Sequence, residues 1–304
     1  MTLDSLTIVG LARDLEHSIA KNLQVIVSAF SVYRIERIII VESDSSDNTV
    51  KELESLRSTY SNLIYISKGE LENTISNRID RIRFCRNIYV EEMRKLNLES
   101  SYIVVADLDG INNKLKGKNI EKCFKNLEWD AIFPNQLLGY YDILALRHEF
   151  WSSNNCMEEL SWRQSLISIN QNRHWLVRWI LTFYEFDKAR KLSIYSKMIK
   201  INKNLPRIRV QSAFGGIGIY KKDVFMNYDY TAEAESNGCE HVDLHLKMYN
   251  ANMKLYIEPS FINSYINTYN INRFMFIRML RQIVWSSGFL YGLQKKLKKM
   301  VRSR

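Results

Sequence analysis

Short apolar runs alternate with helical patterns along the first 135 residues of the chain. The runs have the length of buried strands, and the longer segments between them repeat apolar positions at helical spacing. The runs lie at residues 6–11, 37–41, 63–66, 102–106 and 131–133. This alternation is typical of a parallel sheet built from βαβ units. The pattern therefore predicts an α/β domain.

Three segments between the predicted strands are expected to be helices. The first carries its apolar positions within residues 15–30 and follows Asp14, which we interpret as its N-terminal cap. Asp47 or Thr49 is expected to cap the second, and we interpret Asp47 as a cap rather than a ligand. The third helix spans residues 79–96. Two of the three arginines at its start are expected to lie on a solvated face: Arg78, Arg81 and Arg83.

The pattern loosens after residue 140. Residues 151–206 are rich in Trp, Asn, Arg and Lys, and they contain a predicted helix near residues 175–186 that has no evident place in the sheet. Residues 211–220 predict a glycine-containing turn that leads into a strand, and residues 240–250 predict a short helix.

Composition indicates a globular protein. Of the 304 residues, 46% are apolar and only three are prolines, which disfavours long disordered tracts. Four cysteines are scattered without a Cys-x-x-Cys pair, so neither a zinc module nor a secreted disulfide framework is indicated. The first 14 residues lack the features of a signal peptide, and no apolar stretch reaches the roughly 18 residues of a spanning helix. We therefore expect a cytoplasmic protein.

The net charge of +10 is concentrated at one end of the chain. Residues 271–304 contain nine Lys or Arg and no acidic residue, so the rest of the chain is close to neutral. This distribution disfavours a protein-wide nucleic-acid surface, and nucleic acid is not an expected partner. The same residues interleave apolar with basic side chains. They predict either a basic amphipathic helix on an anionic membrane surface or a helix packed on the domain.

Two carboxylates directly follow the fourth predicted strand. Asp107 and Asp109 flank Leu108, and in open α/β sheets ligands gather beyond the carboxyl ends of the strands. Hard oxygen ligands suit Mg2+ or Mn2+, and such an ion stabilises a departing diphosphate. Taken alone, an Asp-x-Asp segment is equally typical of a solvated turn. The surrounding sequence decides between the two.

Segments on either side of these carboxylates form an ordered series. Val41-Glu42-Ser43-Asp44-Ser45-Ser46-Asp47-Asn48-Thr49 follows the second strand, and Phe84-Cys85-Arg86-Asn87 lies in the third helix. With Asp107-Leu108-Asp109 they are similar to the Val-Asp-Asp-x-Ser-x-Asp-x-Thr, Ala-Arg-Asn and Asp-x-Asp motifs of the GT-A-fold glycosyltransferases. Gln211-Ser212-Ala213-Phe214-Gly215-Gly216 and Cys239-Glu240-His241-Val242-Asp243 resemble the acceptor-side and C-terminal motifs of bacterial polysaccharide-type members. The resemblance covers roughly residues 5–260.

The resemblance implies an α/β fold with a Rossmann-type, mostly parallel sheet flanked by helices. Residues 1–265 would form the glycosyltransferase domain, with a nucleotide-binding half at 1–135 and an acceptor-binding half at 136–265. Residues 266–304 would form a basic, amphipathic, helical C-terminal appendage.

The resemblance also implies roles for residues of the nucleotide-binding half. Glu42 matches the acidic residue that reads the nucleoside, and Arg86 matches the arginine near the base and the phosphates. Asp107 would contact the ribose side, and Asp109 would bind the metal. Glu42 and Ser43 stand where the family usually has two Asp residues, which leaves the base specificity open. The nucleotide-sugar would also be lined by Leu11, Ala12, Arg13 and Leu108.

Further roles fall in the acceptor-binding half. The segment Phe214-Gly215-Gly216 is expected to bind the acceptor, although its glycines suit a tight turn equally well. His241 and His245 share a helix face, and His241 is expected to be a second metal ligand, with a structural histidine as the alternative. Glu240 and Asp243 are the candidate catalytic bases, one of which an inverting enzyme requires.

The implied reaction moves a hexosyl group from a UDP- or GDP-sugar donor to a glycan or lipid-linked glycan acceptor. Mn2+ or Mg2+ would be the cofactor. The implied process is the synthesis of a surface polysaccharide, such as lipopolysaccharide or capsule, with the protein in the cytoplasm or peripheral on the cytoplasmic face of the inner membrane.

Two other classes of function stay open. Residues 104–110 also fit the opening motif of phosphohydrolases of the haloacid dehalogenase type, in which Asp107 and Asp109 would act on a phosphoester. The late position of the motif, Ile111 after it, and the lack of a downstream acidic motif count against this class. The other is a non-catalytic module that binds membranes or polyanions. The chain has no Gly-x-Gly-x-x-Gly after the first strand and no P-loop, which disfavours a dinucleotide-binding enzyme.

Overall fold

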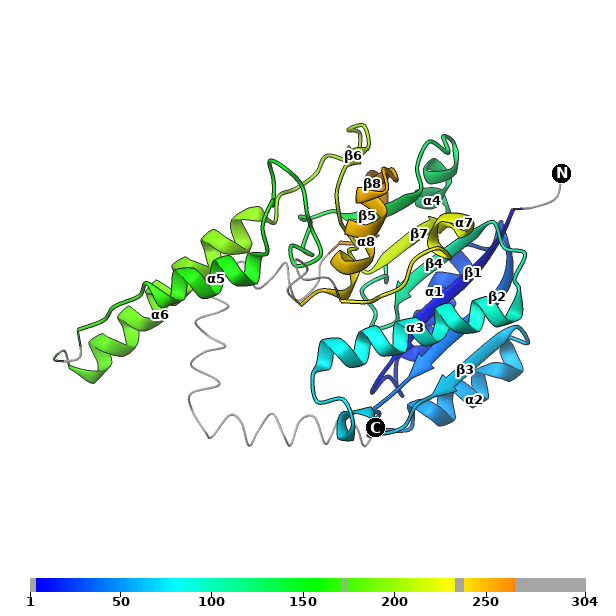
Figure 1. The fold of residues 1–304 in the computed structure, drawn as a ribbon, viewed down its shortest axis with the longest axis horizontal. Helices are drawn as coiled ribbons and strands as arrows, with labels where there is room; N and C mark the ends of the chain where they lie inside the picture. Colours follow the sequence, from blue (N-terminus) through cyan, green and yellow to red (C-terminus); the bar gives the residue numbers. More distant parts are fainter. Residues whose placement is uncertain (1–3, 171, 173, 233–237, 266–304) are drawn as a thin grey trace.

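An eight-stranded sheet runs through the molecule, with helices on both of its faces (Figure 1). The computed structural model describes residues 4–170, 172, 174–232 and 238–265. The strand order is β3-β2-β1-β4-β7-β5-β8-β6. This mixed, mostly parallel α/β architecture confirms the predicted fold class. The predicted C-terminal appendage, residues 266–304, lies outside the described residues.

The first half of the chain forms four parallel strands in the order β3-β2-β1-β4. Because these strands run the same way, their carboxyl ends meet at one edge of the sheet. The strands are β1 (Ser5–Ala12), β2 (Arg34–Glu42), β3 (Leu63–Ser67) and β4 (Tyr102–Asp107), and the helices between them are α1 (Ile19–Ala29), α2 (Thr49–Thr59), the 3-10 turn η1 (Leu71–Asn73) and α3 (Arg78–Leu96). The sequence pattern predicted each of these strands to within a few residues.

The second half extends the same sheet. Strand β7 lies between β4 and β5 and is antiparallel to both, so it joins the two halves. Strand β8 pairs in parallel with β5, and β6 is antiparallel to β8 at the edge. These elements are α4 (Gly117–Phe124), β5 (Ala131–Gln136), β6 (Ile208–Arg209), β7 (Ile217–Lys221), α7 (Lys222–Phe225), α8 (Glu240–Asn250) and β8 (Leu255–Ser264).

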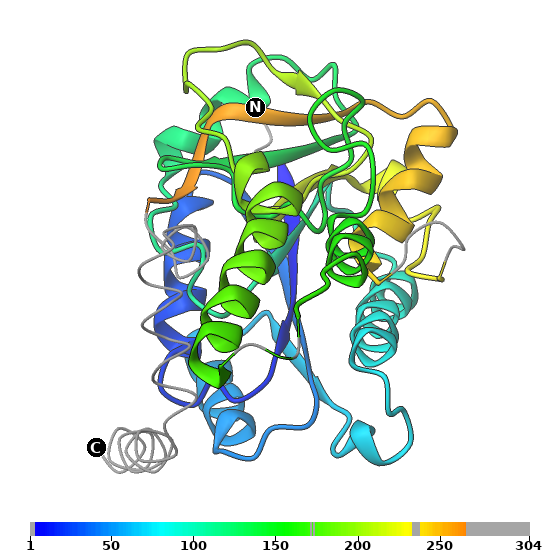
Figure 2. The same ribbon diagram turned by 90° about the vertical axis from the view of Figure 1, so that its left-hand side faces the viewer.

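Two helices project from the body of the molecule (Figures 1 and 2). Helix α5 (Cys156–Ser165) packs against α6 (Trp175–Ser193), and the 3-10 turn η2 (Tyr195–Lys197) returns the chain towards the sheet. Helix α6 contains the predicted helix near residues 175–186 and extends it to Ser193. Its position outside the sheet explains why the apolar pattern gave it no place there.

The core lies on both faces of the sheet. Along β2, Ile39 and Val41 pack on the face covered by α3, while Ile38 and Ile40 pack on the face covered by α1 and α2. Successive side chains of a strand point to opposite faces, so a strand that is buried on both sides reads as a continuous apolar run. The core thereby fixes the sheet edge at which the polar strand ends meet.

The start of α1 differs from the prediction. Helix α1 begins at Ile19 after Ser18, and Asp14 does not cap it. Asp14 instead has a left-handed backbone with φ 52°, and its carboxylate accepts hydrogen bonds from the backbone and hydroxyl of Ser46. The N-cap of α2 is Asn48 rather than Asp47 or Thr49, although the carboxylate of Asp47, one residue earlier, accepts a hydrogen bond from the Thr49 amide. Both acids therefore shape loops at the carboxyl edge of the sheet.

Strand β8 has no counterpart in the sequence prediction. It contains Pro259, and its partner β5 contains Pro134. Proline lacks the amide that a sheet ladder needs, and the β5–β8 register shifts on both sides of Asn135. The local sequence therefore argued against a strand that tertiary pairing forms. Among the described residues, no helix has both the length and the apolar character that a bilayer-spanning segment requires.

Candidate active site

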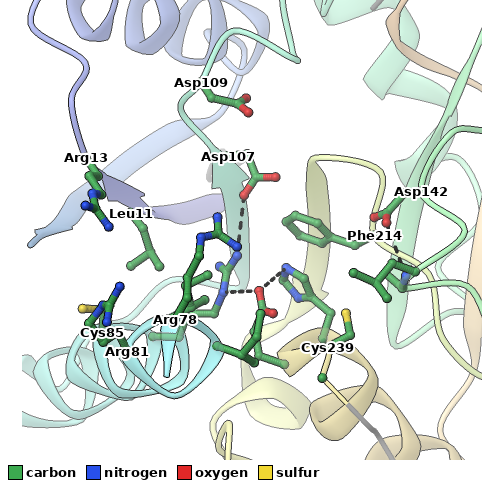
Figure 3. A pocket seen from close by; sticks show the side chains of 18 of the residues that line it. Leu11, Arg13, Arg78, Arg81, Cys85, Asp107, Asp109, Asp142, Phe214 and Cys239 are labelled. Carbon is green, nitrogen blue, oxygen red and sulfur yellow. Dashed lines mark hydrogen bonds and ion pairs between the residues drawn. The ribbon is translucent and has the colours of Figure 1, made fainter. Parts of the chain in front are cut away.

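A cavity of about 620 Å3 opens at the carboxyl edge of the parallel strands (Figure 3). The ends of β1 and β4 form one wall, the start of α3 another, and the start of α8 a third. Leu11 and Arg13 lie on one side of it and Phe214 and Asp142 on the other, with Asp107 and Asp109 between them. Many of the predicted donor residues line it: Leu11, Ala12, Arg13, Arg86, Asp107, Leu108 and Asp109.

The backbone holds Asp107 and Asp109 at the end of β4. The Asp107 amide donates to the Gly216 carbonyl at 2.9 Å, and the Asn112 side chain donates to the Asp107 carbonyl at 2.9 Å. Asp109 Oδ1 accepts a hydrogen bond from the Ile111 amide at 3.1 Å. Burial raises the pKa of Asp107 to about 7, although Arg86 opposes the shift. Two carboxylates are thus fixed side by side at the cavity.

Arg86 forms ion pairs with two of the acids that line the cavity. Its Nε lies 3.1 Å from Glu240 Oε1, and its Nη2 lies 3.5 Å from Asp107 Oδ1. Its guanidinium also lies 5.6 Å from the ring centroids of Phe214 and Tyr230. Arg86 is buried, so this pairing offsets a large desolvation cost. The arginine therefore joins β4 to α8 across the cavity floor.

His241 lies against this cluster with unused hydrogen-bonding capacity. Its ring stacks on Phe214 with centroids 3.5 Å apart, and its Nε2 lies 3.6 Å from Glu240 Oε1, although neither ring nitrogen has a hydrogen-bond partner in the described part of the chain. Burial and the nearby Arg86 hold the pKa of His241 well below its ordinary value, so the ring is neutral. A neutral imidazole with an unpartnered nitrogen at a cavity wall has the form of a metal ligand.

Three further arginines border the donor side of the cavity. Arg13 and Arg78 line it with exposed side chains. Arg81 also lines it, but it is buried and bonded to the carbonyls of Ile75 and Ser76 and to Asp44. The expectation that two of the three arginines that open α3 are solvated was wrong. Among Arg78, Arg81 and Arg83, only Arg78 is exposed.

Glu42 has a different place from the one its motif implies. Its carboxylate is buried and accepts hydrogen bonds from the Ser45 amide at 3.1 Å and the Ser67 hydroxyl at 2.5 Å. It does not line the cavity, whereas Ser43 and Asp44 do. Glu42 therefore stabilises the loop after β2. Asp44 lines the cavity, but its carboxylate pairs with Arg81 and accepts a hydrogen bond from the Glu72 amide.

The two candidate bases occupy unlike positions. Asp243 has no exposed surface, does not line the cavity, and accepts a hydrogen bond from Arg83 Nε at 2.7 Å. Glu240 lines the cavity but is paired with Arg86. The structure thus leaves Asp243 without access to a substrate in the cavity, because it lies on the side of α8 that faces α3.

Only part of the predicted acceptor segment reaches the cavity. Phe214 lines the cavity, but Gly215 and Gly216 do not. Both glycines are buried with positive φ angles of 69° and 94°. The Gly216 carbonyl accepts the Asp107 amide and the Asn112 side chain. The alternative of a tight turn fits the two glycines, and the turn supports Asp107.

Asp142 is a cavity residue that the sequence pattern did not reveal. Its Oδ2 accepts from the Gly215 amide at 2.9 Å and its Oδ1 from the Ala145 amide at 3.3 Å. Burial raises the pKa of Asp142, although these hydrogen bonds oppose the shift. Its position in the loop after β5, at the same edge as Asp107, is the one signal that the sequence contained.

The donor set at the cavity fits a divalent ion only in part. Asp107 and Asp109 offer carboxylate oxygens, and His241 offers an unpartnered nitrogen. Within the described residues, no group of three or more His, Cys, Asp or Glu side chains is assembled to hold a metal by itself. Any ion held here would need further ligands besides these side chains.

Comparisons with known proteins give only distant similarities. No protein-family model and no curated protein matches the chain. The structure is similar to that of the mannosyltransferase PcManGT from Pyrobaculum calidifontis in complex with GDP-Man and Mn2+, with a TM-score of 0.42, 10% identity, and coverage of 85% of this chain and 56% of that one. It is also similar to residues 1–349 of S. aureus TarS in complex with UDP, with a TM-score of 0.30, 14% identity, and coverage of 43% and 35%. The chain thus spans about half the length of the first protein and a third of the second.

Proposed function

We propose that this protein is a metal-assisted glycosyltransferase that uses a nucleotide-sugar donor. The observation that carries the proposal is the cavity itself, in which Asp107 and Asp109 at the end of β4 lie between arginines on one side and Asp142 on the other. Such a site can bind a diphosphate at its centre and keep the donor and acceptor on opposite sides. The resemblance of the surrounding motifs to GT-A-fold glycosyltransferases supports the same assignment.

The donor side is the part of the cavity bordered by β1 and α3. Leu11 and Ala12 offer an apolar wall for a base, and Asp44 is the nearby acid. Arg13 and Arg78 bring exposed positive charge to the position where the phosphates would lie. We therefore assign these residues to the nucleotide, a UDP or GDP group, and Glu42 to the loop that supports them.

Asp109 and His241 are the proposed protein ligands of a divalent ion, with Asp107 beside them. When bound, Mn2+ or Mg2+ would supply positive charge that stabilises the departing diphosphate. The unpartnered ring nitrogens of His241 support this assignment. The carboxylate pair favours a hard ion of this kind, since oxygen donors suit Mg2+ and Mn2+.

Asp142 is the proposed general base. Glu240 is engaged with Arg86 and Asp243 with Arg83, and Asp109 is assigned to the metal. Asp142 is the remaining candidate on the acceptor side, and its carboxylate accepts hydrogen bonds from two backbone amides. In an inverting transfer it would accept the proton of the acceptor hydroxyl as the new carbon–oxygen bond forms. The bond between the sugar and the diphosphate breaks, and the nucleoside diphosphate leaves.

The acceptor is proposed to be a growing surface glycan, free or attached to a lipid. The Phe214 ring lies on the Asp142 side of the cavity, but it is buried and stacked on His241, so this class of acceptor rests on the family resemblance. The hexosyl class of the transferred sugar follows from the family resemblance alone.

A thermal-shift panel tests the donor assignment. Purified protein would be heated with UDP, GDP and their hexose conjugates, with and without MnCl2. We expect one nucleotide series to raise the melting temperature by several degrees only with the metal present. Asp109→Asn should lose the shift, whereas Asp223→Asn, an exposed acid on α7, should keep it. If no nucleotide stabilises the wild-type protein with the metal, the proposal fails.

A further inference from the structure

The first part of α6 is only partly buried, and its side chains are either exposed or of intermediate exposure. None of the residues from Trp175 to Phe186 is buried, and the buried residues of this helix are confined to its last two turns. Eight of the ten residues from 175 to 184 are nonetheless apolar or aromatic. A helix of this composition normally packs into a core or against another apolar phase.

Helix α5 extends this apolar surface at the end of the projecting pair. Trp162 is 58% exposed, Leu166 is 64% exposed, and Trp175 is 65% exposed. The α5–α6 hairpin, residues 156–193, thus carries the following exposed apolar or aromatic side chains: Met157, Trp162, Leu166, Trp175, Leu176, Val177, Ile180, Tyr184 and Leu192. Single exposed apolar residues are common on protein surfaces and do not indicate a binding site. A cluster of them on one projecting element does indicate an interaction site.

The charge of the hairpin identifies what kind of surface it would meet. Residues 160–184 contain three arginines and no acidic residue, and residues 156–203 contain nine basic and four acidic residues. The exposed basic residues that follow the apolar part include Lys188, Arg190 and Lys191. Tryptophan and arginine beside aliphatic side chains are the composition of segments that lie in the interface of an anionic bilayer.

Charge also disfavours the two other occupants. A symmetric contact between the hairpins of two copies would bring two positive surfaces together. Residues 271–304 contain nine basic residues and no acidic one, so they would repel the hairpin as well. An anionic lipid surface satisfies both the apolar and the basic side chains.

We propose that the α5–α6 hairpin is a membrane-docking element that inserts its apolar tip into the headgroup region of an anionic bilayer. The base of the hairpin adjoins the cavity, since Cys156 and Met157 of α5 and Ile194 and Tyr195 beyond α6 line it. Docking would therefore tether the molecule to the bilayer, with the cavity held above the lipid at the base of the hairpin. This consequence rests on the proposed function, and it selects a lipid-linked glycan as the acceptor.

Vesicle flotation with the full chain tests the docking element without reference to activity. The vesicles would contain phosphatidylcholine alone or mixed with phosphatidylglycerol. We expect wild-type protein to float with the mixed vesicles, and the triple variant Trp162→Ser, Leu166→Ser, Trp175→Ser to bind at least about tenfold more weakly. The control Val32→Ser, Leu127→Ser removes two exposed apolar side chains from the body of the molecule and should bind as wild type. The single variant Trp175→Glu gives a further check, and its binding to the anionic vesicles should be weaker than that of the wild type.

Three results would overturn the proposal. The first is equal flotation of the triple variant and the wild type, especially where deletion of residues 291–304 abolishes binding. The second is no flotation of wild-type protein with anionic vesicles. The third is a wild-type dimer in light scattering that the triple variant converts to a monomer, which would make the hairpin a contact between copies. Failure of the donor panel with intact flotation would refute the proposed function and leave the docking element standing.

Discussion

At the scale of single residues, Arg86 is the countercharge of two acids that line the cavity. It pairs with Glu240 and Asp107 while buried against Phe214 and Tyr230. The Glu240 side chain is 10% exposed and the Asp107 side chain 37%, so Glu240 depends more strongly on this countercharge. The arginine expected from the sequence to contact a nucleotide therefore also has a structural task.

Replacement of Arg86 measures its contribution to the stability of the fold. We expect Arg86→Ala to lower the free energy of unfolding by about 3 kcal/mol, because it leaves two acids without their partner. Urea unfolding is the measurement. Arg57→Ala is the matched control, since Arg57 forms an exposed pair with Glu54 at 3.2 Å, and it should cost less than about 0.5 kcal/mol. Equal losses in the two variants would show that the Arg86 cluster contributes nothing.

Asp142 gives the residue-scale prediction about catalysis. We expect Asp142→Asn to lower kcat roughly 10²–10⁴-fold with little change in donor binding. In the wild type, kcat should fall as the pH drops through the raised pKa of Asp142, because the protonated acid accepts no proton. The acid limb should therefore lie above the ordinary aspartate pKa of 3.8 and vanish in the variant. Asp223→Asn should keep it, and an unchanged limb in Asp142→Asn would assign the base elsewhere.

The sequence revealed some site residues and not others, for physical reasons. Asp107 and Asp109 directly follow a buried strand, so their place at the sheet edge was predictable. Glu42 also ends a strand, but the Ser45 amide and the Ser67 hydroxyl turn its carboxylate into the loop. Such partners depend on the tertiary structure. Asp142 lies in an irregular loop, where no periodicity indicates the direction of a side chain.

At the scale of elements, the turn before β7 supports the acidic end of β4. Gly216 has a φ of 94°, and a Cβ at this position would lie 2.5 Å from Ile111 Cγ2. Its carbonyl accepts the Asp107 amide. The turn therefore depends on glycine for both its backbone angle and the space it leaves.

Alanine substitutions at two glycines separate the cost of the positive φ angle from the cost of the steric clash. Gly69 has a φ of 61° but open space around its Cα, so Gly69→Ala should cost only the conformational term of about 1 kcal/mol. Gly216→Ala should cost about 3 kcal/mol, because the clash adds to that term. Urea unfolding of both variants checks the difference. Equal costs would contradict the close packing of Gly216 on Ile111.

The strands show how far element prediction could go. Apolar runs predicted β1 to β5, because strands buried on both faces read as continuous apolar segments. The pattern did not show that β7 runs antiparallel between β4 and β5, since pairing partners leave no local signal. It missed β8, because Pro259 argued against a strand and only tertiary pairing with β5 overrides it.

At the scale of the whole molecule, charge and shape divide the protein into two working parts. The sheet and its flanking helices form the cavity, while the α5–α6 hairpin projects from them with an apolar tip and with exposed basic residues towards its base (Figure 1). The sequence showed an apolar helix at residues 175–186 without a place in the sheet, and the structure shows that none of these residues is fully buried. The proposed docking of that tip would hold the cavity above the bilayer.

Release of nucleoside diphosphate from a donor panel tests the central claim most directly. The protein would be incubated with UDP- and GDP-hexoses, with MnCl2 or EDTA, and the released diphosphate would be quantified. We predict release from one donor that requires the metal and falls at least about 100-fold in Asp109→Asn, while Asp223→Asn turns over as wild type. Metal-independent release, or equal rates in Asp109→Asn and the wild type, would contradict the assignment of Asp109 and of the cavity to metal-assisted sugar transfer.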